Sequence, residues 1–192
     1  MKHDAAEGND RRAAIIEAAT RVFLRYGFKK TSMEDLARAA GISRQGLYLH
    51  FPTKEVLFKA GLLRLIEGSA AAVKLALADK DAPVDERVLA AFVAIHGSSI
   101  GTLDSTHLGE LFEAAREIVG TSITELEEGF VADIAKVLRG VPPGTGFKSA
   151  DLTAKDAAQL LHDASYGIKH AVATQAAYRE RMRVAVRLVC GP

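Results

Sequence analysis

Hydrophobic residues recur at intervals of three and four along almost the whole chain. No segment shows the sustained alternation that is typical of a half-buried strand. In residues 12–26, for example, Ile15, Ala19 and Phe23 share one face of a helix. Gly27 follows in the position at which helices commonly end. The pattern therefore predicts an all-α protein.

Two short helices, joined by a tight turn, are expected next. Thr31 and Glu34 have the spacing of a capping box, which predicts that the second helix opens there. Gly41 permits the positive φ of a tight turn, and Ser43 is a good N-cap for a third helix. Pro52 ends that helix, because the residue before a proline avoids helical geometry.

Six further helices follow, which makes about nine in total. Thr53 and Thr153 are good N-caps, and Ser122 with Glu125 has the spacing of a second capping box, so a helix is expected to open at each. Residues 140–149 form the one clear loop. The six helices are expected over residues 53–78, 83–100, 105–119, 122–139, 153–175 and 178–191.

Composition describes an ordinary globular protein of 192 residues, with 48% hydrophobic and 26% charged residues. No apolar run reaches the roughly 18 to 20 residues of a membrane span, and no signal peptide is evident. The single Cys190 cannot form an intrachain disulfide. These features favour a cytoplasmic protein without a membrane partner.

Charge is distributed unevenly. Residues 1–60 carry 11 Lys and Arg against 7 Asp and Glu, a net +4, whereas the remainder carries 14 against 17, a net −3. A basic first part indicates a polyanionic partner for that part alone.

The residues around the glycine turn suit nucleic-acid recognition, because two short helices so joined form a helix-turn-helix. The first turn of the second helix reaches furthest toward base edges, where Arg44 can bond two acceptors of guanine and Gln45 can pair with adenine. Leu47 has two alternatives, contact with a thymine methyl group or packing inward. Tyr48 and His50 are placed to reach phosphates.

Three short patterns lie between Gly27 and Leu62, namely "GF..TS", "DLA..AG.S...LY.HF" and "P.KE.L". Together they make this segment resemble the DNA-binding domain of the TetR family of bacterial transcriptional regulators. The resemblance implies a helix-turn-helix domain in residues 1–52 and a helical effector-binding and dimerisation domain in residues 53–192. It also implies a homodimer on a palindromic double-stranded DNA operator, and a repressor that a small molecule releases. A cavity lined by alanine, valine, leucine and phenylalanine would favour a largely apolar effector.

The resemblance further implies roles for particular residues of the first domain. Lys54 is implied to touch phosphate, although an ordinary solvated lysine is the alternative; a cation in a first helical turn opposes the macrodipole, so some other benefit is expected. The implied phosphate contacts are Thr31, Ser32, Tyr48, His50 and Lys54, and the implied base contacts are Arg44, Gln45 and Leu47.

Polar and aromatic residues beside the apolar stripes of the second domain are candidates for an effector cavity, with plain core packing as the alternative. These are Phe92, His96, Phe112, Arg116, Tyr166 and His170. Small and apolar residues of the last two helices are candidates for the dimer interface, where the family forms a four-helix bundle. These are Ala157, Ala164, Gly167, Ala171, Met182 and Val186.

The sequence offers no catalytic constellation, so we expect a protein that is not an enzyme and that needs no cofactor. The histidines of the second domain match no compact metal-ligand spacing, so isolated polar groups are favoured over a metal site. The rival interpretation keeps the fold but not the effector, as a DNA-bound factor that recruits another protein. An enzyme that carries a look-alike motif is a third.

Overall fold

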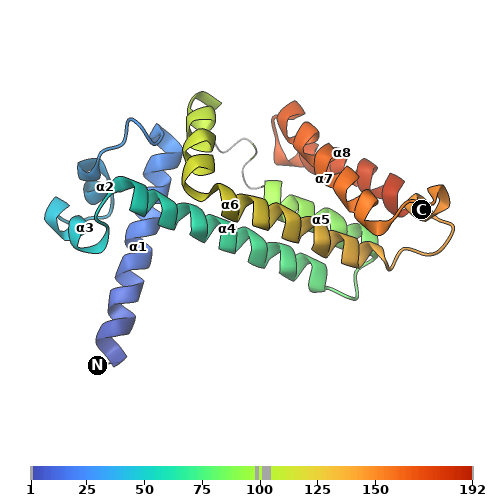
Figure 1. Ribbon diagram of the computed structural model, residues 1–192, viewed down its shortest axis with the longest axis horizontal. Coiled ribbons are helices and arrows are strands. Elements are labelled where there is room, and N and C mark those ends of the chain that lie inside the picture. Colours follow the sequence, from blue (N-terminus) through green and yellow to red (C-terminus); the bar gives the residue numbers. More distant parts are fainter. Residues whose placement is uncertain (1, 98–99, 101–104, 192) are drawn as a thin grey trace. The chain divides into compact units, whose positions relative to one another are not determined.

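The structure is a computed structural model that describes residues 2–97, 100 and 105–191, and of residues 2–7, 105–109 and 112 it describes the backbone alone. Every regular element in these ranges is helical, which confirms the predicted all-α class (Figure 1). The elements are α1 (Lys2–Tyr26), α2 (Met33–Ala39), α3 (Arg44–His50), α4 (Lys54–Ala78), α5 (Val84–His96), α6 (Ser105–Leu138), the 3-10 helix η2 (Gly146–Ala150), α7 (Ala154–Ala171) and α8 (Gln175–Cys190).

The chain divides into two compact units, one of Met1–Ile66 with Leu103–Ile123 and one of Glu67–Thr102 with Thr124–Pro192. The predicted boundary lay after residue 52, where the resemblance separates a DNA-binding domain from an effector-binding domain. The division into compact units differs from it. The reason is that the start of α4 and the first half of α6 supply core residues to the first unit. Because compact units say nothing about binding, the DNA-binding and effector-binding domains remain predictions.

The core of the first unit joins α1, α2 and α3 to the start of α4. Phe23 and Phe58 meet edge to face with their ring centroids 5.0 Å apart. Burial of each large apolar side chain contributes about 1.5–3 kcal/mol to folding. Four members of this core have no exposed surface, namely Leu36, Leu47, Phe51 and Leu57.

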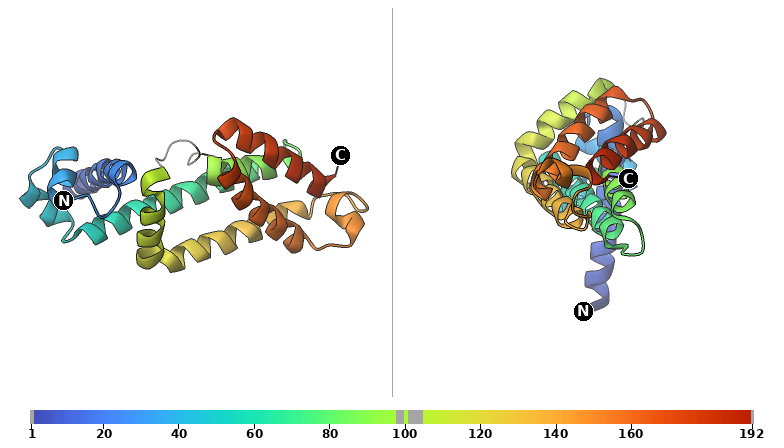
Figure 2. Two further views of the ribbon diagram at one scale, coloured as in Figure 1. Left: turned by 90° about the horizontal axis from the view of Figure 1, so that it is seen from above. Right: turned by 90° about the vertical axis from the view of Figure 1, so that its right-hand side faces the viewer.

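In the second unit α8 packs against α5, α7 and η2. Both views of Figure 2 show the last two helices, drawn orange to red, lying side by side. Phe92 and Phe130 meet edge to face with their ring centroids 5.0 Å apart. The core around them includes Leu89, Ile134, Leu138, Leu161, Tyr178 and Met182.

The break that was predicted after residue 119 is present, but the cap predicted beyond it is not. The helices expected over residues 105–119 and 122–139 correspond to the two segments of α6, which meet at a kink. Val119 lies at this kink with a non-helical φ of −135° and ψ of 22°. Ser122 and Glu125 lie beyond the kink inside the second segment, so the capping box predicted at Ser122 is wrong. Counted as one kinked helix, α6 is one of eight α-helices in the described ranges, where about nine were expected.

A second correction concerns the start of α2, where the capping box lies one residue later than predicted. The Ser32 hydroxyl accepts a hydrogen bond from the Asp35 amide at 3.2 Å, and the Asp35 carboxylate accepts one from the Ser32 amide at 3.1 Å. The predicted cap at Thr153 is confirmed, because its hydroxyl accepts from the Asp156 amide at 3.1 Å.

Two helices begin earlier than the sequence indicates. The first was expected near residue 12, but α1 already begins at Lys2. The last was expected at Tyr178, but α8 begins at Gln175 because the Thr174 hydroxyl accepts from the Ala177 amide at 3.2 Å. The apolar stripe marks only the packed part of a helix, so exposed polar turns beyond it escape prediction.

Candidate nucleic-acid interface

A tight turn connects α2 to α3. Gly41 has φ +67°, as predicted, and the Ile42 amide donates to the Ala37 carbonyl at 3.1 Å. The Ser43 hydroxyl caps α3 by accepting from the Gly46 amide at 3.0 Å. A Cβ atom at Gly46 would lie 3.2 Å from that hydroxyl, so the glycine gives the cap its room.

Helix α3 has one buried and one exposed face. Leu47 is fully buried and belongs to the core of the first unit, so its predicted base contact is wrong and its alternative, packing inward, is correct. The opposite face is exposed to solvent. It consists of Arg44, Gln45, Tyr48 and Leu49, which we call the α3 face.

Within the α3 face, Arg44 and Tyr48 contact each other across one helical turn. The Arg44 guanidinium lies 5.6 Å from the centre of the Tyr48 ring and donates to the Tyr48 hydroxyl at 3.4 Å. Pairs four residues apart on a helix stabilise each other's positions. Tyr48 therefore orients a side chain that matches the acceptor pair of guanine.

Lys54 ties the start of α4 to the loop that leads into α2. Its ammonium group donates to the Phe28 carbonyl at 2.9 Å and to the Thr31 carbonyl at 3.1 Å, and it lies 4.4 Å from the centre of the Phe28 ring. Two of its three donors are thereby used inside the protein. These internal contacts offset the unfavourable interaction between a cation in the first turn of α4 and the helix macrodipole.

Thr31 and Ser32, both predicted to contact phosphate, differ in exposure. Thr31 is only 3% exposed, and its hydroxyl donates to the Gly27 carbonyl at 2.6 Å, so this group is used to shape the loop. Ser32 is exposed as the N-cap of α2. His50 is half-buried at the end of α3.

Arg12 is an anchor that the sequence did not indicate. Its guanidinium donates to the His50 carbonyl at 2.8 Å and lies 4.2 Å from the centre of the Phe51 ring. These contacts fix the end of α3 against α1. The sequence carries no local signal for them, because Arg12 and His50 are separated by 38 positions.

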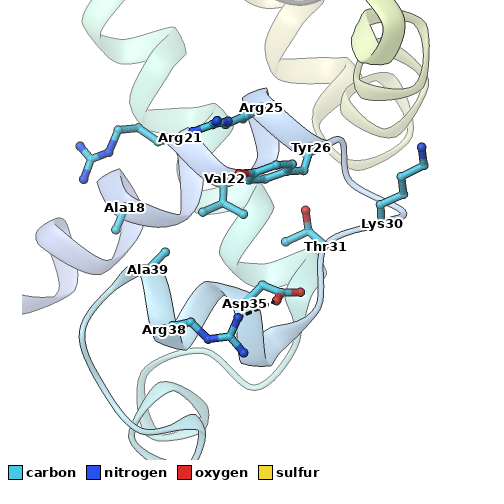
Figure 3. Close-up of a pocket in the computed structure, with 10 residues that line it drawn as sticks. All are labelled: Ala18, Arg21, Val22, Arg25, Tyr26, Lys30, Thr31, Asp35, Arg38 and Ala39. Carbon is cyan, nitrogen blue, oxygen red and sulfur yellow. Dashed lines mark ion pairs between the residues drawn. The ribbon is translucent and has the colours of Figure 1, made fainter.

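A groove of about 760 Å³ runs between α1 and α2 (Figure 3). Ala18, Arg21, Val22, Arg25, Tyr26, Lys30, Thr31, Asp35, Arg38 and Ala39 line it. Four of these ten residues are cations, and the single carboxylate, Asp35, lies 3.7 Å from Arg38. Hydrogen bonds from Ser32 hold the pKa of Asp35 below its usual value. The groove adds positive charge beside the start of α2.

Part of the predicted effector site comes together in the second unit. His96 and Tyr166 meet edge to face with their ring centroids 5.2 Å apart. Phe92, which precedes His96 by four residues on α5, is fully buried. Arg116 and His170 are exposed, and Arg116 belongs to the first unit. The side chain of Phe112 lies outside the described residues.

His162, one of the histidines weighed above for a metal site, joins this cluster, although it was not predicted to line the effector site. Its ring centroid lies 5.1 Å from that of Tyr166 and 6.1 Å from that of Phe130. Within the described part of the chain, its buried Nε2 atom has no hydrogen-bond partner. The spacing of four between His162 and Tyr166 on one helix is a signal that would have grouped them.

Burial shifts the pKa values of two members of the cluster, His96 and Tyr166. It lowers the pKa of His96 to about 3, helped by the nearby charges of Lys169 and His162. His96 is therefore neutral near pH 7. Burial also raises the pKa of the Tyr166 hydroxyl, which donates to the Glu127 carboxylate.

The predicted dimer residues divide into two groups. Ala157, Met182 and Val186 are buried in the core of the second unit, so they are wrong as interface residues. Gly167 and Ala171 are exposed, and Ala164 is half-buried. The same two helices also expose large apolar side chains that the sequence did not single out. These are Leu160, Val184 and Leu188, 56%, 57% and 78% exposed.

The glycine turn, the capped α3 and its exposed polar face define a helix-turn-helix DNA-binding domain. Residues 15–60 match the model of the family described as bacterial regulatory proteins, tetR family. Among the described residues, no helix is long and apolar enough to cross a bilayer.

Curated relatives are similar over part of the chain. The uncharacterized HTH-type transcriptional regulator YfiR of Bacillus subtilis is 32% identical over 111 residues, which are 58% of this chain and 45% of that protein. The HTH-type transcriptional regulator TtgR of Pseudomonas putida is 43% identical over 67 residues, 35% of this chain and 32% of that protein. The similarity thus spans less than half the length of these relatives.

Solved structures share the fold over nearly the whole chain. SCO4454, a TetR-family transcriptional regulator from Streptomyces coelicolor, has a TM-score of 0.71 at 21% identity and covers 98% of this chain and 93% of its own. A TetR-like transcriptional regulator from Rhodococcus has a TM-score of 0.66 at 21% identity over 95% and 97%. At 21% identity these structures show the fold alone, and the match to the tetR family model covers residues 15–60.

Proposed function

We propose that the protein is a transcriptional repressor that binds a palindromic DNA operator as a homodimer. The observation that carries this proposal is the α3 face, which presents hydrogen-bonding side chains to solvent while Leu47 anchors the helix from behind. Arg44 and Gln45 read bases. Ser32, Tyr48 and His50 contact the sugar-phosphate backbone, and they fix the register of the helix on the duplex.

A homodimer is part of the proposal, because one short recognition helix buries too little surface for specific binding. The exposed apolar side chains Leu160, Val184 and Leu188 of α7 and α8 support this interface. Gly167 and Ala171 lie on the same pair of helices and allow close approach. Two α3 helices would then meet half-sites about 34–36 Å apart.

The proposed effector site is the aromatic and histidine cluster of the second unit. Phe92, His96, His162 and Tyr166 offer apolar contact together with a few hydrogen-bonding groups, the usual character of small-molecule sites. The effector would be largely apolar. By preferring a form of the dimer with wrongly spaced α3 helices, it would weaken DNA binding by a coupling of about 1–3 kcal/mol.

The rival proposal is a DNA-bound factor of the same fold that recruits another protein and takes no effector. The two differ in a thermal-shift screen with apolar small molecules. A ligand at about 100 times its dissociation constant stabilises the folded state by about 2.7 kcal/mol. Uniform absence of stabilisation would favour the rival.

Selection of bound sequences from a random duplex library, with purified protein at moderate salt, tests DNA recognition itself. We expect a palindrome with half-sites one helical turn apart. A folded, dimeric protein that enriches no sequence would contradict the proposal. A cytoplasmic location, with access to the chromosome, accompanies it.

A further inference from the structure

Leu49 is the most exposed large hydrophobic side chain in the described part of the chain, at 84%. Leu49 is not part of the core of the first unit, to which α3 contributes Leu47. Single exposed leucines are common on protein surfaces. The position of this one on the recognition helix is what gives it a specific meaning.

Leu49 lies four residues after Gln45 on α3, so the two share one side of the helix, and Tyr48 beside them is exposed as well. Side chains four residues apart project from the same side of a helix. The face therefore combines one apolar group with hydrogen-bonding groups from Arg44, Gln45 and Tyr48. One leucine among polar neighbours forms no broad apolar patch, which argues against a protein partner on this face.

The major groove of DNA offers one apolar group that distinguishes bases, the C5 methyl of thymine. We propose that Leu49 packs against a thymine methyl group of the operator, beside the base pair that Gln45 reads. Leu49 is then a residue that determines specificity through apolar contact, while Arg44 and Gln45 determine it through hydrogen bonds. This inference rests on the proposed role of the α3 face in base readout.

The test replaces each thymine of the selected operator half-site by deoxyuridine, one at a time, which removes only the methyl group. Wild-type protein should bind about fourfold more weakly when the contacted thymine is replaced, as expected for one lost apolar methyl contact. Leu49→Ala should bind the unmodified operator more weakly and should no longer respond to that replacement. Its thermal stability should stay unchanged, because the side chain is exposed.

Leu75→Ala is the matched control, because Leu75 is also a highly exposed leucine, at 77%, but lies on α4. It should retain the full response to deoxyuridine. A wild-type protein indifferent to every replacement, or a Leu49→Ala variant that keeps the wild-type response, would overturn the inference. Failure of the proposed function looks different, since wild-type protein would then enrich no operator at all, and the inference would fail with it.

Discussion

The ammonium group of Lys54 contacts Phe28 twice, at 2.9 Å through the main-chain carbonyl oxygen and at 4.4 Å from the centre of the aromatic ring. Family resemblance implies a phosphate contact for this lysine. The structure gives it an internal task first, because it holds the loop from which Thr31 and Ser32 enter α2.

Replacing Lys54 by alanine should therefore lower stability as well as DNA affinity. Loss of hydrogen bonds made by a charged group costs about 1.5–3 kcal/mol, and urea unfolding measures this loss. Lys59→Ala, at an exposed position of α4, should change stability little. Unaltered stability in Lys54→Ala, together with a salt slope of DNA binding reduced by about 1, would instead assign the lysine to phosphate.

Arg44→Ala should cost about 1–3 kcal/mol of specific DNA binding and relax the preference at one base position. The reason is the bidentate match between guanidinium and guanine, with Tyr48 orienting the side chain. Binding to the operator and to random duplex, measured at one salt concentration, separates the roles. Equal loss on both DNAs would exclude base readout by Arg44.

Acidification should destabilise the protein through His96. Its pKa is about 3 in the folded state and about 6.5 when unfolded, so between these values the unfolded chain binds the extra proton. Stability should fall by about 2 kcal/mol from pH 7.5 to pH 5 on this account. This loss of folding stability on acidification should be smaller in His96→Gln. It should be unchanged in His170→Gln, because His170 is exposed. The same pH dependence in wild type and His96→Gln would contradict it.

Cys190 should be inert in the folded protein. It is buried, and burial with the nearby charge of Asp85 raises the pKa of its thiol to about 12. At pH 8 its thiolate fraction should be about a thousandfold lower than in the unfolded chain. A thiol reagent that reports by absorbance should react only after denaturant is added. Rapid reaction with native protein would show that the site opens.

Leu188→Glu should dissociate the proposed dimer, because it places a charge in the exposed apolar face of α8. Sedimentation at several concentrations should detect a folded monomer. Leu75→Glu, at a similarly exposed leucine of α4, should leave the dimer intact. A Leu188→Glu protein that remains dimeric would place the interface elsewhere.

Sequence patterns predicted the helices because burial repeats at helical period, and they predicted turns where glycine or a capping side chain acts locally. They failed where two neighbouring residues offered the same chemistry. Thr31 and Ser32 are both capping residues, and only the packed loop selects Ser32. Leu47 and Leu49 are both leucines of α3, and only packing shows which one faces solvent.

Contacts between distant segments were invisible to the sequence. The anchor of Arg12 on His50 and Phe51, and the packing of His96 and His162 against the Tyr166 ring, depend on the folded arrangement. The dimer prediction chose small residues of α7 and α8, but periodicity did not distinguish the core stripe from the exposed one. Met182 and Val186 consequently belong to the core, whereas Val184 and Leu188 are exposed.

The most direct test of the account compares the sequences selected from a random duplex library by the wild-type protein and by a variant with Arg44→Ala and Gln45→Ala. Both side chains are exposed, so the variant should fold and dimerise like the wild type. We predict a palindrome for the wild type and its loss in the variant. The same palindrome in both would show that the α3 face does not read the operator.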